Sequence, residues 1–240
     1  HIRQARLHIV EFRGFERFIQ GRPYWELPVL VQRLCGICPV SHHLAAAKAC
    51  DQLVGVDRLT PTAEKVRRLM HLGQTFQSHA LHFFHLSSPD LLFGFDDAVS
   101  HRNIVGVIQD QPEIAKRGVL MRKFGQENIS PEERDYLAAD IDQMVEWAEQ
   151  SVQLVKRIFL TNRDYHYRFA AVDANTLGLI RPDGAFELYH GGLRAKDATG
   201  STLLDHHDYR DYEQVIREEI KPWSYMKFPF LTQLGPERGW

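Results

Sequence analysis

The sequence lacks several features that define whole classes of protein. Its 240 residues include only three cysteines, an odd number that excludes a disulfide-stabilised scaffold and is typical of a reducing compartment. No uninterrupted apolar run approaches the roughly 18 residues of a transmembrane helix. The formal net charge is −2 at pH 7, so no overall field favours nucleic acid or an anionic membrane. We therefore expect a cytoplasmic globular protein that binds neither nucleic acid nor membrane.

Hydrophobic periodicity predicts a mainly α (α+β) fold, in which long helices pack on one another and the β-structure is small. The clearest helix start is Ser130-Pro-Glu-Glu133, a capping box with proline inside it. The turn sequence Arg181-Pro-Asp-Gly184 separates two short β-like stretches. Helices are predicted at about 41–55, 60–86, 130–159 and 209–220, a strand at 1–10, and β-structure within 169–193.

The strongest chemical signal is Arg33-Leu-Cys35-Gly36-Ile-Cys38-Pro-Val-Ser-His42. Two thiols at C-x-x-C spacing can share one metal, because a tight turn, eased by Gly36, brings their sulfurs together. Thiolates are soft ligands that select Ni, Fe, Cu(I) or Zn over Mg or Ca. Cys38 also precedes a predicted helix, whose N-terminal partial charge favours the thiolate. Thirteen histidines also suggest metal, and His42 can donate an N–H to a coordinated sulfur.

The spacing alone leaves three other interpretations open. The C-x-x-C pair can be half of a structural zinc site, although the sequence has no second pair. It can be a thioredoxin-like redox pair, although no βαβ pattern surrounds it. It can also be two inert buried thiols. The third cysteine, Cys50, lies at no ligand spacing, and we expect it to be a small core residue.

Three segments together resemble the large subunit of the [NiFe] hydrogenases. They are Glu11–Glu16 (EFRGFE), Arg33–His42 and Ser224–Pro229 (SYMKFP). The stretch from Cys38 to Lys48 is most similar to the soluble, cytoplasmic, NAD-reducing bidirectional type. The resemblance extends over essentially the whole sequence, and R-x-C-G-x-C-x-x-x-H is its most specific element. It implies a long-helix bundle of the large-subunit type with small peripheral β-sheets.

The resemblance also implies a role for each matching residue. Cys35 corresponds to a terminal nickel thiolate, and Cys38 to a thiolate that bridges nickel and iron. His42 corresponds to a histidine that hydrogen-bonds a bridging sulfur, and Arg33 to the motif arginine, which we expect to hold the turn through carbonyl groups. Glu16 corresponds to a carboxylate near a Mg²⁺ site, with an exposed helix-start charge as the alternative. The predicted catalytic residues are Arg33, Cys35, Cys38 and His42, and the predicted metal-binding residues are Cys35, Cys38 and Glu16.

The implied activity is reversible heterolytic cleavage of H₂ at a Ni–Fe centre whose iron carries diatomic ligands. Electrons would pass to Fe–S clusters on a small subunit, because three cysteines cannot furnish such a cluster here. FMN and NAD would belong to diaphorase partner subunits, since this chain has no G-x-G-x-x-G or Walker motif. The alternatives are a metal-free relative of the quinone-reducing subunit of respiratory complex I, and a non-catalytic C-x-x-C zinc protein.

The sequence departs from the family pattern in what it leaves out. Neither a second C-x-x-C followed by histidine nor an N-terminal Glu-Gly-His element is present, so two of the four thiolates that hold the metal pair are missing. We therefore expect residues 1–240 to form a single large-subunit domain that is incomplete at both ends, and we interpret the junction between Glu127 and Asn128 as an internal gap. A metal-free or precursor form is the hypothesis that fits, because ligand-bearing segments become ordered together with the metal.

Overall fold

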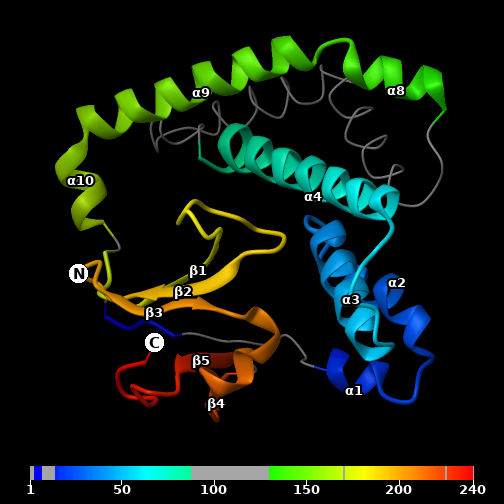
Figure 1. Cartoon of the computed structure of the whole chain (residues 1–240). Coiled ribbons are helices and arrows are strands. Elements are labelled where there is room, and N and C mark those ends of the chain that lie inside the picture. Colours follow the sequence, from blue (N-terminus) through cyan, green and yellow to red (C-terminus); the bar gives the residue numbers. More distant parts are fainter. Residues whose placement is uncertain (1–2, 7–13, 88–129, 170, 225, 240) are drawn as a thin grey trace. The chain divides into compact units, whose positions relative to one another are not determined.

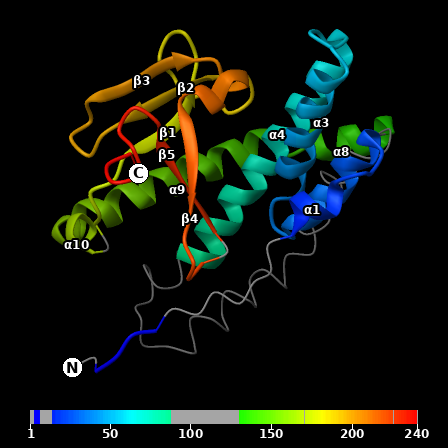
Figure 2. The same ribbon diagram turned by 90° about the horizontal axis from the view of Figure 1, so that it is seen from below.

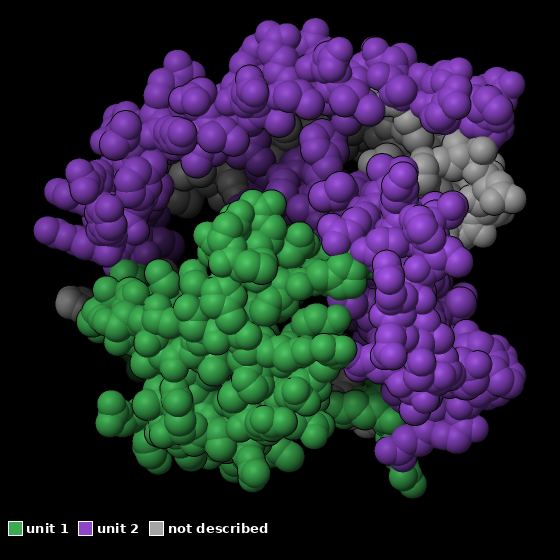
Figure 3. Space-filling model, viewed as in Figure 1, with its two compact units in different colours: residues 1–18, 170–240 green, residues 19–169 purple. Residues whose placement is uncertain are grey.

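The computed structural model describes residues 3–6, 14–87, 130–169, 171–224 and 226–239, with the side chains at 84, 85, 87 and 137 left undescribed. The chain divides into two compact units, one of residues 1–18 and 170–240 and the other of residues 19–169 (Figure 3). Long helices and small antiparallel sheets confirm the predicted mainly α class. The single large-subunit domain over 1–240 stays a prediction, and the proposed gap at 127–128 lies outside the described residues.

Short helices lead into two long ones in the first part of the chain (Figures 1 and 2). Thr60 caps the second long helix, because its Oγ1 accepts the Ala63 N–H at 3.3 Å, and Pro61 occupies the first turn. The predicted helices at 41–55 and 60–86 are confirmed with shifted ends. The elements are α1 (Phe15–Ile19), η1 (Tyr24–Glu26), α2 (Leu27–Val31), η2 (Gln32–Leu34), α3 (Pro39–Leu53), α4 (Pro61–Leu81) and a π-helical segment, η3 (His82–Ser87). Helix α3 contacts both α2 and α4.

The helix predicted over 130–159 is two helices, α8 (Pro131–Ala138) and α9 (Ile141–Thr161), and the single-helix prediction was wrong. The capping box is confirmed: Ser130 Oγ accepts the Glu133 N–H at 3.1 Å, and the Glu133 carboxylate accepts the Ser130 N–H at 3.0 Å. The break falls at Asp140, whose φ of −119° is not helical. Aspartate disfavours helix interiors and favours helix starts, so the sequence permits a new helix there. Helix α10 (Arg163–Arg168) follows.

A three-stranded antiparallel sheet, in the order β1-β2-β3, lies in the unit that contains residues 170–240 (Figure 1). Its strands are β1 (Thr176–Ile180), β2 (Gly192–Lys196) and β3 (Thr202–His207). Leu193 and Ala195 are both buried, as alternation along a strand requires when one face is covered. The predicted turn is confirmed, because the Gly184 N–H donates to the Arg181 carbonyl at 2.8 Å and Gly184 has a φ of +83°.

The helix predicted at 209–220 was wrong. Only Tyr209–Gln214 is helical, as the 3₁₀ segment η4, and β4 (Ile216–Ile220) then pairs antiparallel with β5 (Lys227–Leu231). The ladder places Ile216 opposite Leu231, so pairing with a later segment overrides the local helical pattern. Residues 3–6 form no regular structure, and the rest of the strand predicted at 1–10 lies outside the described residues. In the described part of the chain, no helix has both the length and the apolar character to cross a membrane.

Candidate metal centre

Local backbone geometry places both cysteines of the C-x-x-C motif at the start of α3. Cys35 follows η2 in an extended conformation (φ −139°, ψ 129°). Cys38 is the N-cap residue of α3 (φ −123°, ψ 43°), and Pro39 opens the helix because its missing N–H is not needed in the first turn. His42 lies one turn further along, and its backbone N–H donates to the Cys38 carbonyl at 3.4 Å. The chain therefore presents all three side chains from one short stretch.

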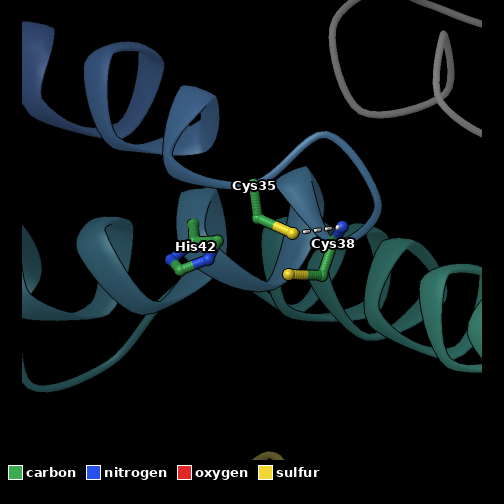
Figure 4. Close-up of side chains that lie close together, drawn as sticks. All are labelled: Cys35, Cys38 and His42. Atoms are coloured by element: carbon green, nitrogen blue, oxygen red, sulfur yellow. Dashed lines mark hydrogen bonds between the residues drawn. The ribbon is translucent and has the colours of Figure 1, made fainter. Parts of the chain in front are cut away.

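The structure brings Cys35, Cys38 and His42 together (Figure 4). The two Sγ atoms and one ring nitrogen of His42 all lie within 4.8 Å of one another, and each residue is half-buried. Both cysteines are free thiols. No other group of three or more metal-ligating side chains was found within the described ranges. Two sulfurs and an imidazole form a soft donor set that suits nickel, iron or zinc and not Mg²⁺.

Hydrogen bonding makes the two thiols unequal. A hydrogen bond from the Cys38 side chain lowers the pKa of Cys35, and the backbone N–H groups of Cys38 and Ile37 lower it further. The Cys38 N–H donates to the Cys35 Sγ at 3.4 Å. The pKa of Cys38 is raised because its thiol donates to Cys35, and burial and the charge of Cys35 add to the effect. Cys35 is therefore the sulfur that ionises first, and metal binding must displace the proton on Cys38.

Two polar contacts support the segment that carries the cysteines. Gln74 in α4 is only 4% exposed, and its Nε2 donates to the Ile37 carbonyl at 3.1 Å. His43 Nδ1 lies 3.2 Å from the Oε1 of Gln32, three residues before Cys35. Burial lowers the pKa of His43, and the nearby charge of Arg67 lowers it further, which favours the neutral ring. The sequence analysis missed Gln74. The usable signal was a glutamine beside Gly73 within the predicted helix, and the structure shows that both residues are buried.

The remaining residues of the motif behave differently from what the sequence predicts. Arg33 is exposed, and no hydrogen bond from it to a described residue is found. The described side-chain contact to the turn comes from Gln74, which donates to the Ile37 carbonyl. A Cβ on Gly36 would meet nothing within 4 Å, so the turn does not require glycine there. His42 lies near both sulfurs, but no hydrogen bond from its ring to either sulfur is found among the described atoms. The catalytic roles predicted for Arg33 and His42 stay predictions.

Glu16 does not sit in a metal-like environment. Its side chain is 64% exposed, and its Oε1 lies 3.2 Å from the Nζ of Lys227. The same ammonium group lies 2.9 Å from a carboxylate oxygen of Glu218, so a lysine occupies the position where a cation would be attracted. The described residues around Glu16 therefore do not fit a Mg²⁺ site. Its predicted metal role rests on the resemblance alone and stays a prediction.

Comparison with known proteins agrees with this cluster. The model of the nickel-dependent hydrogenase family matches residues 13–100, which include both cysteines and His42. The beta subunit of the NAD-reducing hydrogenase HoxS of Cupriavidus necator is 41% identical over 268 residues, covering 98% of this chain and 55% of that protein. The chain is thus similar to nickel-dependent hydrogenases along nearly its whole length. The F420-non-reducing hydrogenase vhu of Methanocaldococcus jannaschii contains a subunit that is 37% identical, over 99% of this chain and 61% of that protein.

Solved structures of hydrogenases share this fold. An NAD⁺-reducing [NiFe]-hydrogenase in the H₂-reduced state superposes with a TM-score of 0.83 at 49% identity, over 98% of this chain and 57% of the other. The [NiFeSe]-hydrogenase of Dm. baculatum, at 18% identity and a TM-score of 0.66, shows the fold alone. This chain thus spans between half and two thirds of the length of these relatives. The predicted family and large-subunit fold are confirmed.

Proposed function

We propose that the protein to which this chain belongs is the catalytic subunit of a [NiFe] hydrogenase that oxidises H₂ reversibly and delivers electrons to NAD through partner subunits. The observation that carries the proposal is the convergence of Cys35, Cys38 and His42, whose ligand atoms lie within 4.8 Å of one another. The similarity of nearly the whole chain to the beta subunit of an NAD-reducing hydrogenase supports the choice of electron acceptor.

The donor set fits half of a Ni–Fe site. Cys35 and Cys38 are the residues that would hold it, since soft thiolates suit nickel and iron. Two sulfurs are fewer than the four that the family uses, so the other two must come from a part of the protein that this chain does not span. When bound, the metal pair supplies the Lewis-acidic, electron-rich centre at which H₂ is split.

The chain's own residues prepare that centre. The Cys38 N–H donates to the Cys35 Sγ and stabilises negative charge on that sulfur. His42 presents a ring nitrogen near both sulfurs, where an N–H can orient a ligated thiolate. Both cysteines are half-buried, so part of each side chain is out of contact with water. A proton released at the centre can be held at the Sγ of either cysteine.

Partners follow from chemistry as well as from similarity. Three cysteines cannot hold an Fe–S cluster in addition to the metal site, so electrons must leave through a small subunit with such clusters. Diaphorase subunits would then carry FMN and bind NAD. The soluble, cytoplasmic location of such an enzyme is part of the proposal, as is Mg²⁺, for which the described residues offer no site.

The test uses the full-length protein purified with its partners. We expect nickel and iron in comparable amounts by elemental analysis and H₂-dependent reduction of NAD⁺ by absorbance. Cys35→Ser is expected to lose that activity to background and to lose nickel. Cys50→Ser is the matched control, because Cys50 is buried elsewhere and its Sγ donates to the Tyr24 carbonyl at 3.3 Å, a bond that serine can keep.

Three results would contradict the proposal. Full H₂ oxidation by Cys35→Ser would end the assignment of this sulfur to the metal. Zinc without nickel or iron, together with no H₂ activity, would favour a structural zinc protein. An active electron-transfer complex with no metal at these cysteines would favour a relative of the quinone-reducing subunit of complex I.

A further inference from the structure

The peptide unit between Ile37 and Cys38 is held on both sides. Its carbonyl oxygen accepts the Gln74 Nε2–H at 3.1 Å, and its N–H donates to the Cys35 Sγ at 3.4 Å (Figure 4 shows the second bond). The described peptide bonds are all trans, so this C=O and N–H point in opposite directions from one rigid plane. A contact that fixes the carbonyl therefore also fixes the direction of the N–H.

Among the hydrogen bonds of the described residues, these two are the ones that hold that plane. Gly36 precedes it and has no side chain, and Ile37 is 55% exposed. The plane turns with ψ of Ile37 and φ of Cys38, and the exposed side chain of Ile37 has little packing to hold it in place. If the plane rotated, the N–H would leave the Cys35 sulfur and a carbonyl oxygen would turn toward it, which repels a thiolate. Gln74 reaches this carbonyl from α4, 37 residues away in sequence.

We infer that Gln74 is a positioning residue of the metal centre, which locks the Ile37–Cys38 peptide so that its N–H faces the Cys35 sulfur and the two thiolates stay convergent. The inference rests on the proposed function, since the locked geometry matters only if these sulfurs bind metal. Gln74 itself touches neither sulfur in a described hydrogen bond, so it acts through the peptide.

The other atom of the same amide argues against a purely stabilising role. The Oε1 of Gln74 is buried and has no hydrogen-bond partner in the described structure. A buried, unpaired oxygen opposes folding, and an apolar side chain of similar shape would avoid that cost. If the side-chain amide of Gln74 were flipped, its Oε1 would face the Ile37 carbonyl oxygen, and the two oxygens would repel each other. The glutamine thus carries a stability cost that its single donated bond must offset, which fits a residue kept for the geometry of the turn.

The experiment compares nickel binding by the full-length, metal-free protein in three forms: unchanged, Gln74→Met and Gln77→Met. Methionine matches glutamine in length and removes the donor. Gln77 is a matched control because it lies on the same helix, is half-buried and has no described hydrogen bond to the turn. Added Ni²⁺ is followed by thiolate-to-nickel charge-transfer absorption in competition with a chelator, and the Tm of each metal-free protein is measured in parallel.

We expect Gln74→Met to weaken nickel binding about tenfold, the lower end of the effect of residues that orient metal ligands. Its metal-free Tm should be equal to or above that of the unchanged protein, and Gln77→Met should match the unchanged protein in affinity. Equal affinity in Gln74→Met would overturn the inference. Weakened binding together with a lowered Tm, or failure to fold, would also overturn it, because a merely structural role predicts that result. If the unchanged protein shows no nickel–thiolate band, the proposed function fails first.

Discussion

The ion pair between Asp51 and Arg67 links α3, which carries His42 and begins directly after Cys38, to α4, which carries Gln74. The guanidinium contacts the carboxylate twice, with Nη1–Oδ2 at 2.5 Å and Nη2–Oδ1 at 3.2 Å. A bidentate contact fixes both position and orientation. We predict that this pair stabilises the packing of the two helices, and that a double-mutant cycle of Asp51→Asn, Arg67→Met and the double variant will measure it.

The magnitude follows from exposure. The side chain of Arg67 is only 20% exposed and that of Asp51 only 23%. Fully exposed pairs couple by about 0.2–1 kcal/mol, and hydrogen bonds to charged groups away from solvent contribute about 1.5–3 kcal/mol. We expect a coupling free energy of about 1.5 kcal/mol for this pair, at the lower end of the second range. The pair of Glu64 and Arg68 on α4 is the control, because Arg68 is 43% exposed and an i,i+4 pair couples by about 0.3–0.5 kcal/mol.

The assay is urea unfolding of the full-length metal-free protein, with the cycle repeated at high salt. Salt should reduce the coupling of the exposed control pair more than that of Asp51 and Arg67, because partly buried charges are screened less. A coupling equal to that of the control, or one abolished by salt, would refute the argument that burial strengthens this pair.

Two further predictions concern the unit that contains the sheets. Gly191→Ala should lower the free energy of unfolding by about 1–3 kcal/mol, because the new Cβ would lie 2.5 Å from the Glu187 carbonyl oxygen. Gly178→Ala is the control and should change that free energy little, since its Cβ meets only a ring carbon of Phe186, at 3.9 Å. Equal effects of the two substitutions in thermal unfolding would contradict this. Hydrogen bonds from Arg210 lower the pKa of Asp208 from 3.8 to about 2. The Asp208 carboxylate should therefore stabilise the fold above pH 3.8, and this stabilisation should disappear as the pH falls toward 2. A carboxyl ¹³C titration of Asp208 with a midpoint at or above 3.8 would contradict this.

The parts of the candidate metal centre that depend on neighbours in sequence were predictable. Cys35, Cys38 and His42 lie within eight residues, and a turn followed by a helix start leaves few ways to separate their side chains. The cap at Thr60 and the capping box at Ser130 depend equally on side chains three residues from the backbone groups that they bind. Such short-range geometry is encoded in adjacent residues, so the sequence by itself determined it.

Contacts between distant segments were decided only by the tertiary structure. The bond from Gln74 to the Ile37 carbonyl needs α4 to pack behind the turn, and no local pattern states which carbonyl a buried amide will reach. Pairing of β4 with β5 overrode the helical pattern before Ile220 in the same way. Lys227 likewise lies against the carboxylate of Glu16, and the residues around Glu16 in sequence do not predict a partner so distant along the chain. Hydrogen bonds between sequence neighbours depend on local residues alone, whereas those between distant segments require the folded chain to bring the segments together.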